Sequence, residues 1–438
     1  MFKNFLAFVK YLLRWVVIIV LVAVAIGSMV AFFLWLLTQA IHFRFAHTWL
    51  LYLLPAAGVV IHLLYKWYGQ SAERGNNLII DEIHQPGAGV PKRMAPLILI
   101  TTVITHLFGG SAGREGTAVQ IGGSLANLFA AWFKLNDADK KIVLTAGVAA
   151  GFGAVFGTPL TGTVFALEVI AIGSIPYRCF FACLIAGYIG DIIVSLWGIH
   201  HTLYHVNIVN TGQTLYGIQL PVSLWLLGKV IMASALFGLV SYAFAQAVHT
   251  VKNILLKLIK TTWVIPVAGG LAIIALTYIL GKPDYLSLGV DAEYPGAVTI
   301  VSAFQHGGAD ALSWLWKLIY TAITLGTGFK GGEVTPLFYI GATLGNTLAD
   351  LMNAPAGLFA ALGFIAVFAG ATNTPVACTL MGIELFGGHY AIFFAIACFT
   401  AYFFSGDGGI YTAQKTALAK TDLAKSKYVK RMFGKYRL

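Results

Sequence analysis

The chain has 438 residues, of which 58% are hydrophobic and only 10% are charged, and its formal net charge is +11. A soluble domain has roughly a quarter of its residues charged. So few charged side chains cannot cover a soluble protein of this size. The composition therefore excludes a soluble protein and predicts a polytopic membrane protein.

Most of the excess positive charge lies at the two ends of the chain. Residues 415–438 contain eight basic residues and one acidic residue, and the first fourteen residues contribute Lys3, Lys10 and Arg14. Positive flanks stay on the cytoplasmic side of a membrane, so both termini are expected in the cytoplasm. The basic tail favours contact with anionic lipid. Nucleic acid is the disfavoured alternative, because the tail has no aromatic pattern for stacking bases.

The first apolar segment, residues 15–41, resembles a signal peptide at its start but is about twice as long as a signal-peptide core. It predicts a retained membrane helix, and residues 48–68 predict a second span. The four cysteines lie in apolar segments without the spacing of a zinc site, so we expect them to pack inside the protein.

After a polar stretch at 69–89, thirteen further apolar runs follow, and many are shorter than the roughly 20 residues of a straight span. Glycine accounts for 48 residues and interrupts several runs. Such short, broken helices indicate backbone that ends inside the membrane, where it must line a cavity or be buried in protein. The runs are near 94–108, 115–133, 141–156, 159–173, 176–197, 221–246, 263–280, 292–304, 312–326, 334–351, 355–370, 374–386 and 389–405.

An internal repeat joins the two halves of the chain. GTPLTGTVFALE at 157–168 aligns with NTPVACTLMGIE at 373–384, which places Glu168 opposite Glu384. GREGT at 113–117 aligns with GGEVT at 331–335, which places Glu115 opposite Glu333. The chain has seven glutamates, so two aligned pairs predict a duplicated transport fold.

The two aligned breaks predict an anion site in the middle of the membrane. Each break leads from glycines into the start of a helix, whose first amides have no partner within the helix and attract negative charge. Two ordinary interhelical turns are the alternative for each break taken alone. The repetition around buried glutamates favours the site.

A glutamate at an anion site can couple the anion to a proton. The ionised Glu115 carboxylate can itself occupy the positive helix end, and a protonated Glu115 can leave so that an anion enters. Arg114 is either an anion ligand or a charged neighbour at the entrance, and its sequence position does not decide between them.

GSAGREGTAVQIGG at 110–123 resembles the central motif of the CLC family of chloride channels and anion/proton antiporters. The order of motifs is similar along nearly the whole chain, ending with the tyrosine of GGIYTAQ at 408–414. The resemblance implies an all-α homodimer with inverted-topology repeats of tilted, broken helices. It also implies that Glu115 is the gating glutamate and that Tyr411 binds the central anion.

Departures from the common pattern resemble the fluoride/proton antiporter branch of that family. Asn76 lies where a serine usually closes the inner side, GREG is followed by Thr117 instead of proline, and Val169 replaces an internal relay glutamate. The resemblance implies that Glu333 joins Glu115 in gating and proton transfer. The implied anion-binding residues are Gly113, Gly116, Asn76, Val334, Thr335 and Tyr411.

Fluoride is small and strongly hydrated, so short hydrogen bonds from Asn76 and Thr335 would suit it. We therefore predict a fluoride/proton antiporter that exports cytoplasmic fluoride from a plasma membrane, the bacterial inner membrane. Its partners are fluoride (with chloride as the alternative), protons, the lipid bilayer and a second copy of the chain. A chloride/proton antiporter or passive chloride channel is the alternative, and a membrane-embedded enzyme or assembly protein is disfavoured by the absence of a catalytic dyad.

The remaining polar residues have structural interpretations. Glu168 and Glu384 are expected to brace the repeats, His200, His201 and His205 are expected in a solvated loop, and no residue spacing suggests a metal site or cofactor. The expected organisation is a stub and first helix (1–47), a first repeat (48–218), a second repeat (219–414) and a basic cytoplasmic tail (415–438), with one transmembrane domain in all.

Overall fold

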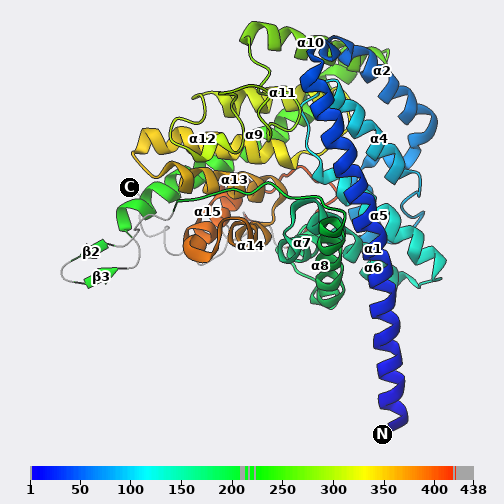
Figure 1. Cartoon of the computed structure of the whole chain (residues 1–438). Helices are drawn as coiled ribbons and strands as arrows, with labels where there is room; N and C mark the ends of the chain where they lie inside the picture. The colour runs from blue at the N-terminus through cyan, green and yellow to red at the C-terminus, as the bar shows by residue number, and fades with distance from the viewer. Residues whose placement is uncertain (1, 208–212, 216–217, 221–222, 418–419, 421–438) are drawn as a thin grey trace, which may run out of the picture.

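The computed structural model describes residues 2–207, 213–215, 218–220, 223–417 and 420. Most of the basic tail predicted at 415–438 therefore lies outside the described residues. Within them the structure has fifteen α-helices (Figure 1): α1 Phe2–Ala46, α2 Leu54–Leu64, α3 Asn76–His84, α4 Met94–Leu107, α5 Glu115–Trp132, α6 Asp137–Phe156, α7 Pro159–Glu168, α8 Phe180–Leu196, α9 Leu224–Leu258, α10 Val264–Leu280, α11 Ser313–Gly326, α12 Val334–Met352, α13 Ala356–Thr372, α14 Pro375–Phe386 and α15 Ala391–Phe404.

Short elements complete the fold. Single helical turns lie at Thr48–Leu53, Tyr65–Gly69, Gln70–Arg74, Tyr177–Cys179, Ser302–Phe304 and Gly388–Tyr390. Two small strand pairs form: β1 (Ala171–Ile172) is parallel to β4 (Lys415–Thr416), and β2 (Gln213–Leu215) is antiparallel to β3 (Ile218–Leu220). The protein is an all-α membrane protein, as its sequence predicts.

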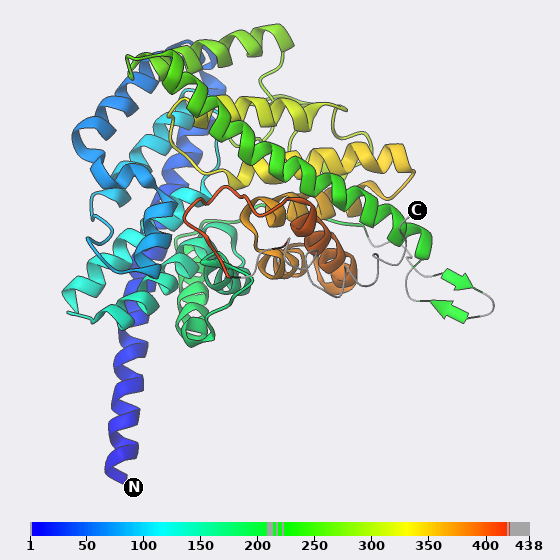
Figure 2. The ribbon, with the colours of Figure 1, turned by 180° about the vertical axis from the view of Figure 1, so that it is seen from behind.

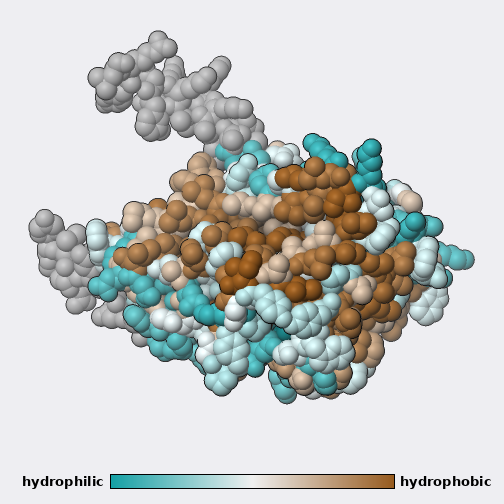
Figure 3. All heavy atoms as spheres, turned by 90° about the horizontal axis from the view of Figure 1, so that it is seen from above, coloured by the Kyte–Doolittle hydropathy of each residue, from teal (hydrophilic) through white to brown (hydrophobic). Residues whose placement is uncertain are grey.

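Helix lengths and surface agree with a membrane setting. Four described segments are long and apolar enough to cross a bilayer, namely Leu12–Ala46, Thr48–Arg74, Tyr177–Leu196 and Leu224–Leu258. Five further apolar helical segments have only 10–17 residues. Large hydrophobic side chains are exposed on many helices, and Figure 3 shows them covering much of one face. Lipid can cover such a surface, whereas in water an apolar surface of this extent would promote aggregation.

Helix pairs α5–α6 and α12–α13, which follow the two aligned sequence breaks, cross very closely. A Cβ added at Gly122 of α5 would lie 2.2 Å from the carbonyl oxygen of Gly147, and one at Gly341 of α12 would lie 2.0 Å from that of Gly363. Only glycine permits these contacts between backbones. Small residues at helix crossings are the usual solution in membranes, where lipid provides no hydrophobic force between helices.

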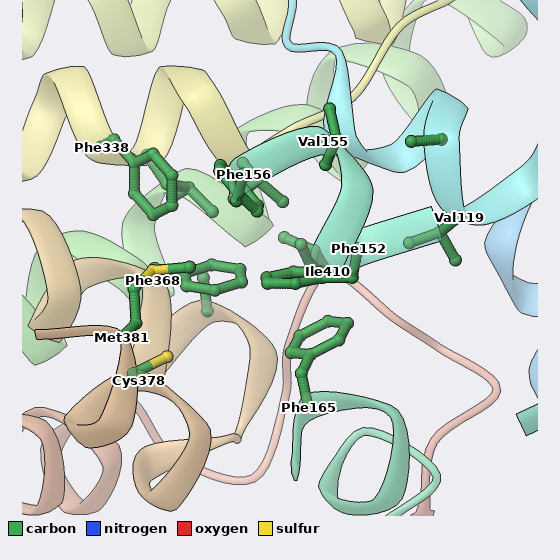
Figure 4. Packing of buried hydrophobic residues seen from close by; sticks show 14 of the residues in the cluster. Val119, Phe152, Val155, Phe156, Phe165, Phe338, Phe368, Cys378, Met381 and Ile410 are labelled. Atoms are coloured by element: carbon green, nitrogen blue, oxygen red, sulfur yellow. The ribbon is translucent and has the colours of Figure 1, made fainter. Parts of the chain in front are cut away.

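An aromatic cluster packs the two halves against each other. Phe152 and Phe165 stack with ring centres 4.3 Å apart, and Phe368 of the second half lies 5.7 Å from Phe165. Figure 4 shows these rings beside Phe156 and Phe338 in the buried core. Ring pairs at such separations stabilise a core beyond the area that they bury.

Helices α7 and α14 form a reciprocal pair at the same interface. The Glu168 carboxylate, at the end of α7, accepts hydrogen bonds from the amides of Val376 (3.1 Å) and Ala377 (2.8 Å) at the start of α14. The Glu384 carboxylate accepts bonds from the amides of Leu160 (3.0 Å) and Thr161 (2.7 Å) at the start of α7. Each glutamate thus satisfies the free amides of the partner helix.

Three sequence expectations differ from the structure. Apolar residues 292–304 form turns and one short 3-10 helix instead of a membrane helix, and Pro295 and Gly296 lie at the start of this segment. The polar stretch 69–89 contains α3, whose buried apolar residues lie against the rest of the protein. Helix α9 continues to Leu258, because its polar end is helical beyond the apolar run.

The segment after α15 runs back across the middle of the molecule to β1, as Figure 2 shows. Along this path the Ile410 amide donates to Ala371 (2.9 Å), and the Ala413 amide donates to the Asn77 side chain (2.9 Å). These two bonds fix the segment on either side of Tyr411.

Candidate functional site

The two repeated glycine breaks meet in the centre of the protein. Gly113 and Gly332 exchange backbone hydrogen bonds of 2.6 and 2.7 Å, which makes a short antiparallel bridge between the loops. Helices α5 and α12 begin just after this bridge. Two helix N-termini, each with partial positive charge, therefore lie together as the sequence predicts.

Glu115 begins α5, but its carboxylate lies on the N-terminus of α12. The carboxylate accepts hydrogen bonds from the amide of Thr335 (3.1 Å), from the Thr335 hydroxyl and from the amide of Arg114 (3.1 Å). Only 1% of Glu115 is exposed. The carboxylate thus occupies the position that a free anion would take at this helix end.

Glycine at position 113 makes this approach possible. A Cβ there would lie 2.8 Å from a Glu115 carboxylate oxygen and 3.0 Å from the Thr335 amide nitrogen. Any side chain would collide with the bond between them. Gly113 and Thr335 therefore lie directly at the bound carboxylate, and Val334 is buried beside them.

Arg114 lies beside Glu115 on one side of the bridge. Its Nε atom is 3.8 Å from a Glu115 carboxylate oxygen, and the residue lines a small cavity with His201, Tyr204 and Phe338. His201 is partly buried here and packs against Gly157, so the expectation of a fully solvated histidine loop is wrong for this residue. Arg114 therefore places a positive charge beside Glu115 in the lining of the small cavity.

A larger cavity of about 470 Å³ lies on another side of the bridge. Glu333, Asn76 and Tyr411 all line it, although they come from distant parts of the sequence. Gly116 faces the same region, since a Cβ there would lie 3.1 Å from the Asn76 side-chain nitrogen. The structure thus places the predicted residues in two groups, one around the Glu115 carboxylate and one around this cavity.

Some cavity residues are absent from the sequence predictions. Gln120 lies one helical turn after Gly116 and lines the cavity, as do His249, Lys252 and Lys330. The helical spacing from Gly116 could have indicated Gln120. Lys330 lies three residues before Glu333, but that loop has no regular periodicity from which to predict its direction.

Other singled-out residues lie away from both groups. The Thr117 hydroxyl bonds that of Thr102 (2.7 Å) and helps pack α5 on α4. Val169 is buried at the end of α7, and Glu168 and Glu384 take part in the caps between α7 and α14. The four cysteines are buried and free. None of these residues lines the large cavity.

Broken helices whose N-termini meet around a buried carboxylate define a membrane transport protein for anions. The sequence matches the voltage gated chloride channel family over residues 57–406, so the chain belongs to this family of channels and transporters, which are not enzymes.

Relatives extend the comparison to the whole chain. A chloride/fluoride channel protein of Pseudomonas syringae pv. tomato is 46% identical over 94% of this chain and 88% of its own. The crystal structure of a CLC-type fluoride/proton antiporter matches with a TM-score of 0.84 and 33% identity, covering 93% of this chain and 98% of that one. A slow cyanobacterial Cl⁻/H⁺ antiporter, 19% identical with a TM-score of 0.76 over 94% and 99% of the two chains, shares the fold.

Proposed function

We propose that the protein is a fluoride/proton antiporter that exports cytoplasmic fluoride, with Glu115 as its protonatable gate. The observation that carries this proposal is the Glu115 carboxylate on the N-terminus of α12. An ionised carboxylate and a free anion compete for the same amide and hydroxyl. Protonation of Glu115 weakens the interaction of its side chain with the N-terminus of α12, because a helix N-terminus favours negative charge. The anion then takes the place of the carboxylate.

Glu333 supplies a second exchangeable proton in this scheme. It precedes α12 and lines the large cavity, while Glu115 lies across the Gly113–Gly332 bridge. A proton and an anion can therefore reach the junction through the same cavity. The absence of a carboxyl group at Val169 leaves Glu333 to carry the proton between the cavity and the gate.

Fluoride is favoured over chloride by the donors at the site. The Thr335 hydroxyl and the Asn76 amide are compact donors that can approach a small ion closely, and charge-assisted hydrogen bonds are strongest when short. Both the chloride/fluoride channel protein and the fluoride/proton antiporter among the relatives support fluoride as the substrate.

Flux measurements on reconstituted protein test this function. We expect liposomes that contain the protein to release fluoride much faster than chloride, as read by ion-selective electrodes, and to take up protons in return. Chloride release with proton uptake would instead identify a chloride/proton antiporter. Release of chloride without proton movement would identify a passive channel.

The proposal includes the assembly and placement of the protein. We infer a homodimer in the plasma membrane, with inverted repeats at 48–218 and 219–414 and both termini in the cytoplasm. The reciprocal Glu168 and Glu384 contacts support a two-fold relation between the repeats, because each copy gives the other the contact that it receives. The basic flanks support the orientation.

A further inference from the structure

Two ionisable side chains inside the protein lie outside both groups of site residues. Lys317 on α11 and His106 on α4 are fully buried. Among the described residues, no carboxylate forms an ion pair with either of them. An ionisable side chain inside a membrane protein is costly, and it usually has a function. The contacts of these two residues lead to the gate.

Lys317 joins the loop between α10 and α11 to helix α12. Its ammonium group donates hydrogen bonds to the carbonyl oxygens of Tyr285 (3.1 Å) and Ser287 (2.7 Å) in that loop. The Lys317 Nζ atom also lies 5.2 Å from the ring centre of Tyr339 on α12. The Tyr339 hydroxyl donates to the carbonyl oxygen of Val298 (3.2 Å), farther along the same loop. The lysine thus fixes the loop against the helix whose N-terminus holds the gating carboxylate.

Ser287 connects this loop to the glycine bridge through His106. Ser287 has a φ of 50°, which residues other than glycine rarely adopt and which persists where surrounding contacts hold it. Its hydroxyl oxygen lies 2.9 Å from Nδ1 of His106, and Nε2 of His106 lies 3.5 Å from the carbonyl oxygen of Gly113. Because a carbonyl only accepts, Nε2 carries the proton that points toward Gly113. The same carbonyl accepts the Gly332 amide (2.7 Å), so His106 is a second, longer restraint on the bridge.

Helix α11 contacts the loop of the gate a second time, on the same face. Lys317, Thr321 and Thr324 are four and three residues apart, so they lie on one side of the helix. The Ser111 hydroxyl lies 2.9 Å from that of Thr321, and the Ser111 amide donates to the Thr324 hydroxyl (3.1 Å). Ser111 comes two residues before Gly113, so α11 fixes this loop directly at Ser111 and indirectly through Lys317.

We propose that Lys317 is a positioning residue for the gate and acts through Ser287 and His106. It holds the loop between α10 and α11, and that loop restrains the bridge of Gly113 and Gly332 through the histidine. If the bridge shifts, the ionised carboxylate is held less firmly at the N-terminus of α12, and fluoride passes without a proton. The effect on transport rests on the proposed function, whereas the chain of contacts rests on geometry alone.

Removal of the ammonium group tests this role. In Lys317→Met we expect the fluoride flux that is not matched by protons to rise by about tenfold, the order expected when one charge-assisted hydrogen bond is lost. Fluoride and pH are followed together in liposomes. Ser287→Ala removes only the hydroxyl that reaches His106, and it should change the flux in the same direction. Tyr320→Phe is the control, because it removes a buried hydroxyl of α11 that bonds Thr277 instead (3.2 Å).

The double variant Lys317→Met/Ser287→Ala tests whether the two residues act in one chain of contacts. Residues that act through one another have effects that do not add, so the double variant should leak no more than the stronger single variant. Effects that multiply would mean that Lys317 acts by another route and would overturn the assignment. If Lys317→Met fails to fold by size-exclusion chromatography, Ser287→Ala alone decides, and an unchanged ratio of protons to fluoride in it would also overturn the proposal.

Hydrogen exchange of the detergent-solubilised protein, followed by mass spectrometry, gives a readout independent of transport. The amides of Gly113 and Gly332 bond each other's carbonyl groups, so peptides that contain them report opening of the bridge. We expect faster exchange of these peptides in Lys317→Met and in Ser287→Ala but not in Tyr320→Phe. If the original protein moves anions without protons, the proposed function fails, and exchange still decides whether Lys317 restrains the bridge. Unchanged exchange in both variants would overturn that restraint.

Discussion

At the scale of single residues, the protein depends on one carboxylate placed where an anion would bind. Only 1% of Glu115 is exposed, and its carboxylate accepts hydrogen bonds from Thr335, which lies in the other half of the chain. In Glu115→Gln the side chain keeps its shape but can no longer exchange a proton. We expect fluoride movement without coupled proton movement, measured by following fluoride and pH together in liposomes.

The control for this change is Asp137→Asn, which neutralises an exposed acid on α6 away from both site groups. It should leave the ratio of protons to fluoride unchanged. Protons that still follow fluoride in Glu115→Gln would remove Glu115 from the role of gate.

The Thr335 hydroxyl makes a second prediction at this scale. Thr335→Val keeps the volume but removes a hydrogen-bond donor that contacts the Glu115 carboxylate. A hydrogen bond to a charged group contributes about 1.5–3 kcal/mol, so fluoride flux should fall by about tenfold or more. Thr335→Ser keeps the hydroxyl and should retain most of the flux. Equal flux in the two variants would mean that the hydroxyl does not contact the ion.

Residue pairing was the part of the site most accessible from sequence. The repeat alone aligned Glu115 with Glu333 and Glu168 with Glu384, because duplicated segments keep equivalent positions. Sequence could not show that Glu115 reaches the opposite helix, since this depends on the bridge between Gly113 and Gly332. The sequence also could not show that Lys330 lines the cavity, because side-chain directions in a glycine-rich loop do not follow a regular repeat.

At the scale of elements, close helix crossings hold the site in place. A Cβ added at Gly345 of α12 would lie 2.1 Å from the carbonyl oxygen of Phe359 on α13. Gly345→Ala should therefore force these helices apart and lower stability by about 1–3 kcal/mol. Thermal unfolding in detergent measures the change.

Gly228→Ala is the matched control, because nothing lies within 4 Å of an added Cβ at that position on α9. Alanine favours a helix more than glycine does, so this variant should be as stable as the original protein or more so. Equal melting temperatures for the two variants would contradict the tight crossing.

The reciprocal caps give a second prediction for elements. Glu168→Gln and Glu384→Gln each weaken the hydrogen bonds to the start of the opposite helix, α14 or α7. Each change should cost about 1–2 kcal/mol of stability, near the upper range for a charge at a partly buried helix end. The preference for fluoride over chloride should remain, because neither glutamate lines the large cavity. A changed ion preference with unchanged melting would instead place these glutamates on the ion path.

Helix boundaries were predictable where an apolar run met proline or glycine, as at the start of α7 and at both ends of α14. The run predicted at 159–173 extends past the end of α7 at Glu168. The prediction failed at residues 292–304, where hydrophobicity alone suggested a helix but the chain folds as turns. Residues 297–300 of that loop are buried, and the Asp284 carboxylate and the Gly289 carbonyl accept hydrogen bonds from the amides of Val298 and Ile300. These contacts with an earlier part of the chain could not be predicted from apolar composition.

At the scale of the whole molecule, different parts of the chain are expected to set its orientation and to carry the ion. The excess basic charge lies at the termini, where it orients the protein in the membrane. The rest of the chain, which contains the site, is nearly neutral. Net charge does not draw anions to the core, so we expect the helix N-termini at the Gly113–Gly332 bridge to do so. The orientation then decides which side the large cavity faces. Segments Leu12–Ala46 and Thr48–Arg74 follow each other and are both long and apolar enough to cross a bilayer, so we expect residues near Lys66 on the same side as the N-terminus.

Cysteine labelling in intact bacterial cells tests this orientation. The four native cysteines are buried, so a membrane-impermeant maleimide should label the original protein weakly. Thr48→Cys places an exposed thiol at the turn between the first two spans, and Lys66→Cys places one at the other end of the second span. With cytoplasmic termini, the first variant should react in intact cells and the second only after the membrane is permeabilised. The reverse pattern would turn the cavity of Asn76, Glu333 and Lys330 toward the outside and would overturn the proposal that this cavity receives cytoplasmic fluoride.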